Sequence, residues 1–102
     1  HPDMFCVIYR WQLKPGREDD FVAAWERLTR AIRNDRGGLG SRLHRADDGL
    51  WVAYAQWPDR ATWESAQRRE SANPDAAAAM AETVAERDEP LLLEAVADLL
   101  VR

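Results

Sequence analysis

Apolar and polar positions near the N-terminus alternate with the period of a β-strand. Between Met4 and Leu13, one set of alternate positions is apolar or aromatic: Phe5, Val7, Tyr9, Trp11 and Leu13. The positions between them are Cys6, Ile8, Arg10 and Gln12. Because successive side chains of a strand point to opposite faces, the segment is predicted to be a strand with two different faces. The Lys-Pro-Gly sequence at 14–16 is expected to end it.

The following segment has the spacing of an amphipathic helix. Its large apolar residues recur three or four positions apart, at Phe21, Trp25, Leu28 and Ile32. Acidic residues fill positions 18–20 and arginines lie toward the other end, which suits the helix dipole. Two glycines, at 37 and 38, supply a stop.

A hairpin and a second helical region are predicted next. The runs 41–46 and 50–57 flank the turn sequence Asp-Asp-Gly at 47–49, which favours an antiparallel hairpin. Asp59 is expected to cap a helix after it. Asn73 and Pro74 then restart helix through an alanine run toward Val84, so the second helix is predicted to be broken in two.

The C-terminal stretch from Pro90 to Val101 fits two structures. Its leucines, alanines and glutamates favour helix by propensity, and its alternation is weak. A fourth strand, however, would pair a sheet edge that three strands leave open. We therefore predict a strand, and with it an α+β fold: a ferredoxin-like βαββαβ unit with an antiparallel four-stranded sheet, forming a single domain over 4–102. Residues 1–3 are expected to be left over from expression, with Met4 the native start.

Composition and charge limit the classes of molecule with which the protein is expected to interact. The 102 residues are 46% hydrophobic and include five tryptophans, enough for a core. A net charge of −4 disfavours nucleic acid and anionic membranes, and there is no apolar run of about 18 residues and no signal peptide pattern, so we expect a cytoplasmic protein. The leucines near the C-terminus and a sheet covered on one side only predict a homodimer.

Motifs for cofactors are absent from the sequence. It contains no glycine-rich dinucleotide fingerprint, no P-loop and no Cys/His spacing for zinc, and Cys6 is its only cysteine. We therefore expect no cofactor and no metal. An oxidation catalysed by this chain would have to use the electrons of its own substrate.

The segments "YRWQLKPGRE", "GSRLHRADDGLWVAYAQW" and "PDRATWE" together resemble the antibiotic biosynthesis monooxygenase (ABM) family. The resemblance runs from about Met4 to the C-terminus. It implies a dimeric α+β barrel, in which two sheets face each other with the helices outside. The family includes cofactor-independent quinone-forming monooxygenases and haem-degrading enzymes. Of the haem-degrading pattern only Trp63 matches, because Tyr9 stands where those enzymes have an Asn and no His follows Trp63.

Three residues are candidates for catalysis, each with a simpler alternative. The resemblance places Trp63 in the cleft between helices and sheet, where it could equally be a core anchor. Tyr9 is predicted on the helix-covered face. There its phenol could bind a substrate oxygen, or it could be a core side chain whose hydroxyl forms a hydrogen bond at the rim. His44, the sole internal histidine, is a candidate base by elimination, or an exposed hairpin residue.

Further residues could bind a substrate or only pack. Trp11, Trp25 and Tyr54 are candidates for contact with an aromatic small molecule, with packing as the default alternative. Arg10 is predicted to face the dimer interior, where it needs an anionic partner, either Asp98 or Glu94.

Three functions fit these observations. The first is a cofactor-independent monooxygenase that acts on a small phenolic or hydroquinone-type substrate. The second is a non-catalytic dimeric module that binds a small metabolite, and the third is an isomerase or detoxification enzyme acting on a small carbonyl compound. In the first case Tyr9 and Trp63 should converge on one pocket between sheet and helix.

Overall fold

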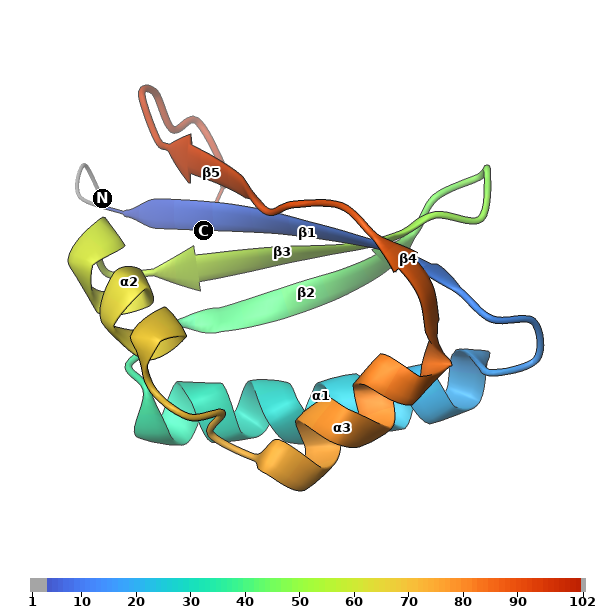
Figure 1. Cartoon of the computed structure of the whole chain (residues 1–102). Coiled ribbons are helices and arrows are strands. Elements are labelled where there is room, and N and C mark those ends of the chain that lie inside the picture. The colour runs from blue at the N-terminus through green and yellow to red at the C-terminus, as the bar shows by residue number, and fades with distance from the viewer. Residues whose placement is uncertain (1–3, 102) are drawn as a thin grey trace.

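The computed structural model describes residues 4–101, so the expectation for residues 1–3 lies outside the described residues. Its elements are, in chain order, β1 (Phe5–Leu13), α1 (Glu18–Asp35), β2 (Gly40–Arg45), β3 (Trp51–Trp57), α2 (Arg60–Arg68), α3 (Pro74–Thr83), β4 (Val84–Arg87) and β5 (Leu91–Glu94). Figure 1 shows α1 and α3 on one side of a twisted antiparallel sheet, with α2 at its end. The predicted α+β, ferredoxin-like fold is confirmed.

The sheet differs from the prediction at one edge. Its strand order is β2-β3-β1-β4, and β5 also pairs with β1. β4 pairs with the end of β1, at Trp11–Leu13, and β5 pairs with its beginning, at Phe5–Ile8. The predicted fourth strand is therefore two short strands in line, which makes five in all. Pro90 lies in the break between them, and a proline cannot donate a backbone hydrogen bond to a sheet.

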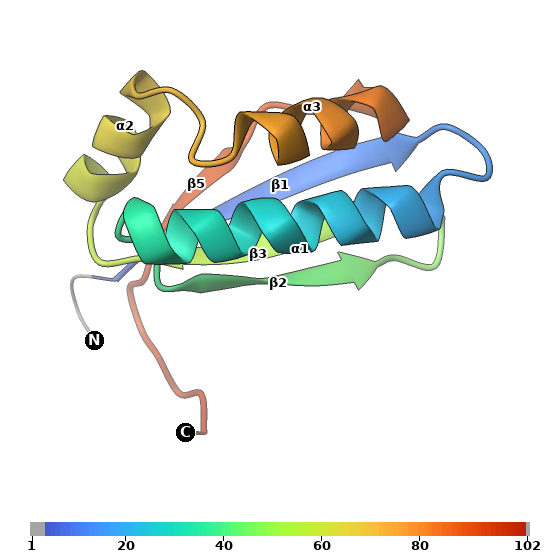
Figure 2. The same cartoon turned by 90° about the horizontal axis from the view of Figure 1, so that it is seen from below.

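The C-terminal strand is shorter than the stretch for which it was predicted. Within residues 90–101 only Leu91–Glu94 forms a strand. Glu94 pairs with Phe5, the first residue of β1, so the residues after Glu94 have no strand beside them to pair with. Figure 2 shows the chain from there to the C-terminus leading away from the helices.

The second helical region is broken in two as predicted. Asp59 caps α2 by accepting a hydrogen bond from the Thr62 amide at 2.7 Å. Asn73 caps α3 by accepting from the Ala76 amide at 3.1 Å, with Pro74 at the first helical position. α3 ends at Thr83, one residue before the predicted end, because Val84 already begins β4.

The core lies between the sheet and the helices, on the predicted face of β1. One cluster joins Phe5 and Val7 to β3, and a second joins Trp11 to Phe21 of α1 and to Ala53. The Phe21 ring is fully buried and meets two tryptophan rings edge-on, Trp11 at 5.2 Å and Trp51 at 5.6 Å between centroids. Figure 2 shows α1 running along the strands.

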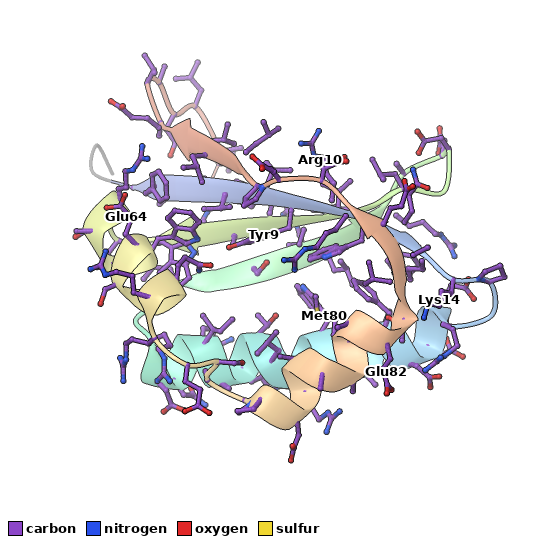
Figure 3. All side chains as sticks on the ribbon, viewed as in Figure 1. Tyr9, Arg10, Lys14, Glu64, Met80 and Glu82 are labelled. Carbon is purple, nitrogen blue, oxygen red and sulfur yellow. The ribbon has the colours of Figure 1, made fainter. Side chains whose placement is uncertain are left out.

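The other face of β1 carries Arg10, which pairs with a residue that was not predicted. Its Nε atom lies 3.7 Å from Asp88 Oδ2, and a terminal nitrogen donates to the Glu89 carbonyl at 3.2 Å. Asp88 and Glu89 follow β4 directly, and the split edge strand brings them beside Arg10. Figure 3 shows Arg10 and Tyr9 on opposite sides of the sheet.

Phe21 is expected to be the residue on which stability depends most. Phe21→Ala should lower the free energy of unfolding by about 3 to 5 kcal/mol, because a fully buried ring leaves a cavity. Phe21→Leu keeps most of the volume and should cost about 1.5 kcal/mol or less. Urea denaturation of both variants measures this. Equal losses in the two would show that the volume of the ring is not what matters at this position.

Candidate active site

A pocket of about 240 Å³ lies between the sheet and the helices. Its walls are mostly aromatic and apolar, and they include Tyr9, Trp11, Trp25, Leu28, Ile32, Trp57 and Met80. Its polar groups include Thr29 and Arg33 of α1, Gln67 of α2 and Arg87 of β4. An apolar cavity with a few convergent polar groups is the usual form of a small-molecule site.

The local structure explains why these side chains meet. Tyr9 and Trp11 are two positions apart on β1 and therefore share its helix-covered face. In α1, Trp25, Leu28 and Ile32 are spaced three or four residues apart, which places them along one side of the helix. Figure 3 shows Tyr9 pointing into the space between sheet and helices, toward the side on which Met80 rises from α3.

Tyr9 is held by Trp63. The indole Nε1 of Trp63 donates a hydrogen bond to the Tyr9 hydroxyl oxygen at 3.0 Å, and the Tyr9 ring stacks on Trp11 at 5.9 Å between centroids. Trp63 itself packs against Phe5 and does not line the cavity. Since indole can only donate, the Tyr9 oxygen is the acceptor and its own proton is available to another group.

The environment of Tyr9 keeps its phenol neutral. Burial raises the pKa of Tyr9 above its ordinary value, and the hydrogen bond from Trp63, which favours the phenolate, only partly offsets this. At neutral pH Tyr9 is therefore a hydrogen-bond donor and not a base. Such a donor can stabilise negative charge on the oxygen of a bound molecule.

His44 and Tyr54 lie on the other face of the sheet. His44 is exposed on β2, where its Nε2 accepts from Arg42 Nε at 3.0 Å and its Nδ1 lies 3.3 Å from the Val52 carbonyl. Tyr54 pairs with Ile8, and its hydroxyl lies 3.1 Å from Cys6 Sγ. The hydrogen bond with Cys6 is the main cause that raises the pKa of Tyr54. The structure thus brings Tyr9, Trp11 and Trp25 to one pocket, with Trp63 bonded to Tyr9 from outside the lining, and leaves His44 and Tyr54 apart.

The four polar residues of the pocket named above were all missed at the sequence level, and Arg87 and Gln67 illustrate the reason. Arg87 pairs with Trp11 in the sheet and so shares its face, but the segment containing it carries no clear alternation. Gln67 lies on α2, one turn beyond Trp63. The spacing of Gln67 from Trp63 was the available signal, while Arg87 had none because its strand has only four residues.

Neither a metal cluster nor a membrane-spanning helix occurs in the part of the chain that is described. Over residues 4–101, no three His, Cys, Asp or Glu side chains come close enough together to hold a metal ion. Among the helices of the same range, none has both the length and the apolar composition that a membrane span needs.

The raised pKa of Tyr9 predicts a loss of stability in alkali. Below a pH of about 10, the ordinary pKa of tyrosine, the phenol is neutral in both states and its contribution is fully present. As the pH rises from there toward the folded-state pKa, the unfolded chain gains by releasing the proton, so stability falls. Urea denaturation at pH 8 and pH 11 should show a smaller loss for Tyr9→Phe than for the wild type. Glu82→Gln, an exposed change that keeps both tyrosines, is the control and should lose as much stability as the wild type. Parallel losses in Tyr9→Phe and the wild type would contradict the prediction.

Comparison with known proteins places the chain in a family. The model of the antibiotic biosynthesis monooxygenase family matches residues 4–73, more than half of the chain. No curated protein sequence matches the chain significantly.

Solved structures show the same fold. SnoaB of Streptomyces nogalater, described as a cofactor-independent oxygenase, superposes with a TM-score of 0.79 at 20% identity, covering 95% of this chain and 97% of SnoaB. A Bordetella bronchiseptica protein described as an antibiotic biosynthesis monooxygenase gives a TM-score of 0.80 at 22% identity, covering 93% of this chain and 99% of that one. Rv0793 of Mycobacterium tuberculosis gives 0.75 at 15% identity, covering 96% and 100%. At these identities the likeness shows the fold, and with the match over residues 4–73 the chain belongs to the antibiotic biosynthesis monooxygenase family.

Proposed function

We propose that the protein is a cofactor-independent monooxygenase that oxidises a small phenolic or hydroquinone-type substrate in the pocket between sheet and helices. The observation that carries the proposal is an aromatic pocket lined by a neutral phenol, that of Tyr9, whose hydroxyl is held in place by a hydrogen bond from Trp63. Family membership supports a monooxygenase-type reaction. Rings such as Trp11 and Trp25 supply flat surfaces against which an aromatic substrate can stack.

The pocket residues favour the anion of the substrate. Among the lining residues there is no carboxylate or imidazole, but Arg33 and Arg87 bring positive charge and Tyr9 brings a hydrogen-bond donor. These groups lower the pKa of a bound phenol, so its proton passes to water and the oxyanion stays bound. A catalytic role for His44 stays a prediction that this mechanism does not need.

The oxidation balances without an added reductant. The electron-rich ring anion bonds to one atom of dioxygen through a ring carbon and forms a peroxide. The O–O bond then breaks: one oxygen stays as the new carbonyl, and the other leaves as water with two protons from the substrate. A phenol with an unsubstituted ortho or para position thus becomes a quinone, and the substrate provides all four electrons that dioxygen takes up. The apolar walls keep bulk water from the reacting atoms.

Oxygen uptake tests this function. Purified protein without added flavin, nicotinamide or metal, in buffer with a chelator, should consume one dioxygen per quinone formed from some member of a panel of one- to three-ring phenols and hydroquinones. Tyr9→Phe should lower kcat by roughly 10² to 10³ fold, the range seen when one oxyanion donor is removed. Glu82→Gln, an exposed change on α3 outside the pocket, should leave kcat unchanged.

Three results, the last from a parallel assay with small carbonyl compounds, would contradict the proposal. A requirement for reduced flavin or a metal would exclude the cofactor-independent reaction. Tight binding of phenols with no turnover would favour the non-catalytic binding module. Conversion of small carbonyl compounds without oxygen uptake would favour the isomerase.

We further propose that the protein acts as a homodimer, joined through the sheet face opposite the helices. That face carries Ile8 of β1 with Leu91 and Leu93 of β5, and these two leucines are 46% and 39% exposed in the single chain. Burying an apolar face of this kind against a second copy removes it from water. The cytoplasmic location and the absence of nucleic acid and membrane partners stay predictions.

Sedimentation checks the dimer. The wild type should sediment as a dimer at micromolar concentration, and Leu93→Asp should shift it toward monomer because the new charge would lie in the interface. Leu39→Asp changes another exposed leucine, 53% exposed and outside β5, and should leave the dimer intact. A monomeric wild type would contradict both the dimer and the barrel.

A further inference from the structure

The break in the edge strand leaves a gap beside Tyr9. β5 pairs with β1 up to Ile8 and β4 pairs with it from Trp11 onward, so Tyr9 and Arg10 face residues 88–90 instead of a strand. In this gap the Asp88 amide donates to the Arg10 carbonyl at 3.2 Å. The sheet is therefore open at the one point of its edge that adjoins the candidate catalytic phenol.

A second cavity lies at this gap. Its volume is about 360 Å³, against about 240 Å³ for the inner pocket. Both cavities are lined by Tyr9, Trp11, Gln67 and Arg87. Figure 3 shows Tyr9 and Arg10 on opposite sides of the sheet, and because both line the outer cavity, that cavity reaches around the sheet edge.

The two cavities differ in chemistry. The inner one is mostly aromatic, whereas the walls that belong only to the outer one are Arg10, Asp88, Glu89 and Pro90. The Nε atom of Arg10 is buried and has no hydrogen-bond partner within the described residues, since Asp88 at 3.7 Å is too far for a hydrogen bond. A buried donor without an acceptor is unfavourable, and an oxygen atom of a ligand would satisfy it.

We propose that the outer cavity is a second subsite of the candidate active site, which takes an oxygen-bearing side arm of a ligand whose aromatic ring lies in the inner pocket. This rests on the proposed function, because the inner pocket must hold the ring. Arg10 binds the carbonyl or carboxylate oxygen of the arm. Gln67, which lines both cavities, stands at the junction through which the arm passes and so limits how bulky it can be.

Two matched probes separate the subsites. 2-Naphthol carries the ring alone, and 3-(6-hydroxynaphthalen-2-yl)propanoate carries the same ring with a carboxylate arm. Isothermal titration of the full chain should give the propanoate a Kd at least about tenfold lower, as expected for one added hydrogen bond to a charged group. A third probe, 6-butyl-2-naphthol, has an arm of similar length without oxygen. Its affinity should exceed that of 2-naphthol by less than the affinity of the propanoate does.

Variants then locate the arm. Glu89→Trp should fill the outer cavity and raise the Kd of the propanoate about tenfold or more, while 2-naphthol binds within about twofold of the wild type. Arg10→Met keeps an unbranched stem without the donor, and it should remove the advantage of the propanoate over 6-butyl-2-naphthol. Glu82→Trp places the same large ring on α3 outside both cavities and should change neither affinity.

The outcomes distinguish this proposal from the function on which it rests. If 2-naphthol binds and turns over but the propanoate gains nothing, the outer subsite is wrong and the proposed function stands. If Glu89→Trp weakens the binding of 2-naphthol and of the propanoate equally, with the fold intact by circular dichroism, the subsite is also overturned. If no naphthol binds at all, the inner pocket does not hold aromatic rings, and both proposals fall.

Discussion

The two-faced alternation of β1 is the constraint on which the rest of this structure depends. β1 is the central strand, and β3, β4 and β5 all pair with it. One of its faces carries the rings that pack on α1 and line the pocket, and the other carries Cys6, Ile8 and Arg10. Because strand side chains alternate strictly, a shift of register by one residue would exchange core and open face together.

The same strand links packing to chemistry at Tyr9. Its ring belongs to the core, stacked on Trp11, while its hydroxyl stands at the boundary of the pocket and accepts the hydrogen bond of Trp63. Rigid packing fixes the ring, and the indole fixes the direction in which the phenol can donate. A preorganised donor of this kind does not have to be reoriented when charge develops on a substrate.

The edge of the sheet beside β1 is irregular, in contrast to the rigid packing around Tyr9. Splitting the fourth strand position replaces regular strand pairing opposite Tyr9 and Arg10 by residues 88–90, whose Asp88 amide still donates to the Arg10 carbonyl. Strand edges and breaks are where natural sheets most often depart from regular pairing, and such departures can admit a ligand to a buried face. In this chain the interruption coincides with the one position of β1 where a polar ring reaches the pocket.

The sequence by itself determined the elements whose signal is local. Alternation set the two faces of β1, three-and-four spacing set the buried side of α1, and Asp59 and Asn73 marked the starts of α2 and α3. The grouping of Tyr9, Trp11 and Trp25 around one pocket follows from these patterns.

Only the tertiary structure decided the remainder. The last residue of β5 pairs with the first residue of β1, and Arg10 forms an ion pair with Asp88 at the sheet edge. Arg87 lines the pocket because it pairs with Trp11. These outcomes depend on which distant segments lie side by side, and a short strand or a lone charge carries no periodic signal from which that could be read.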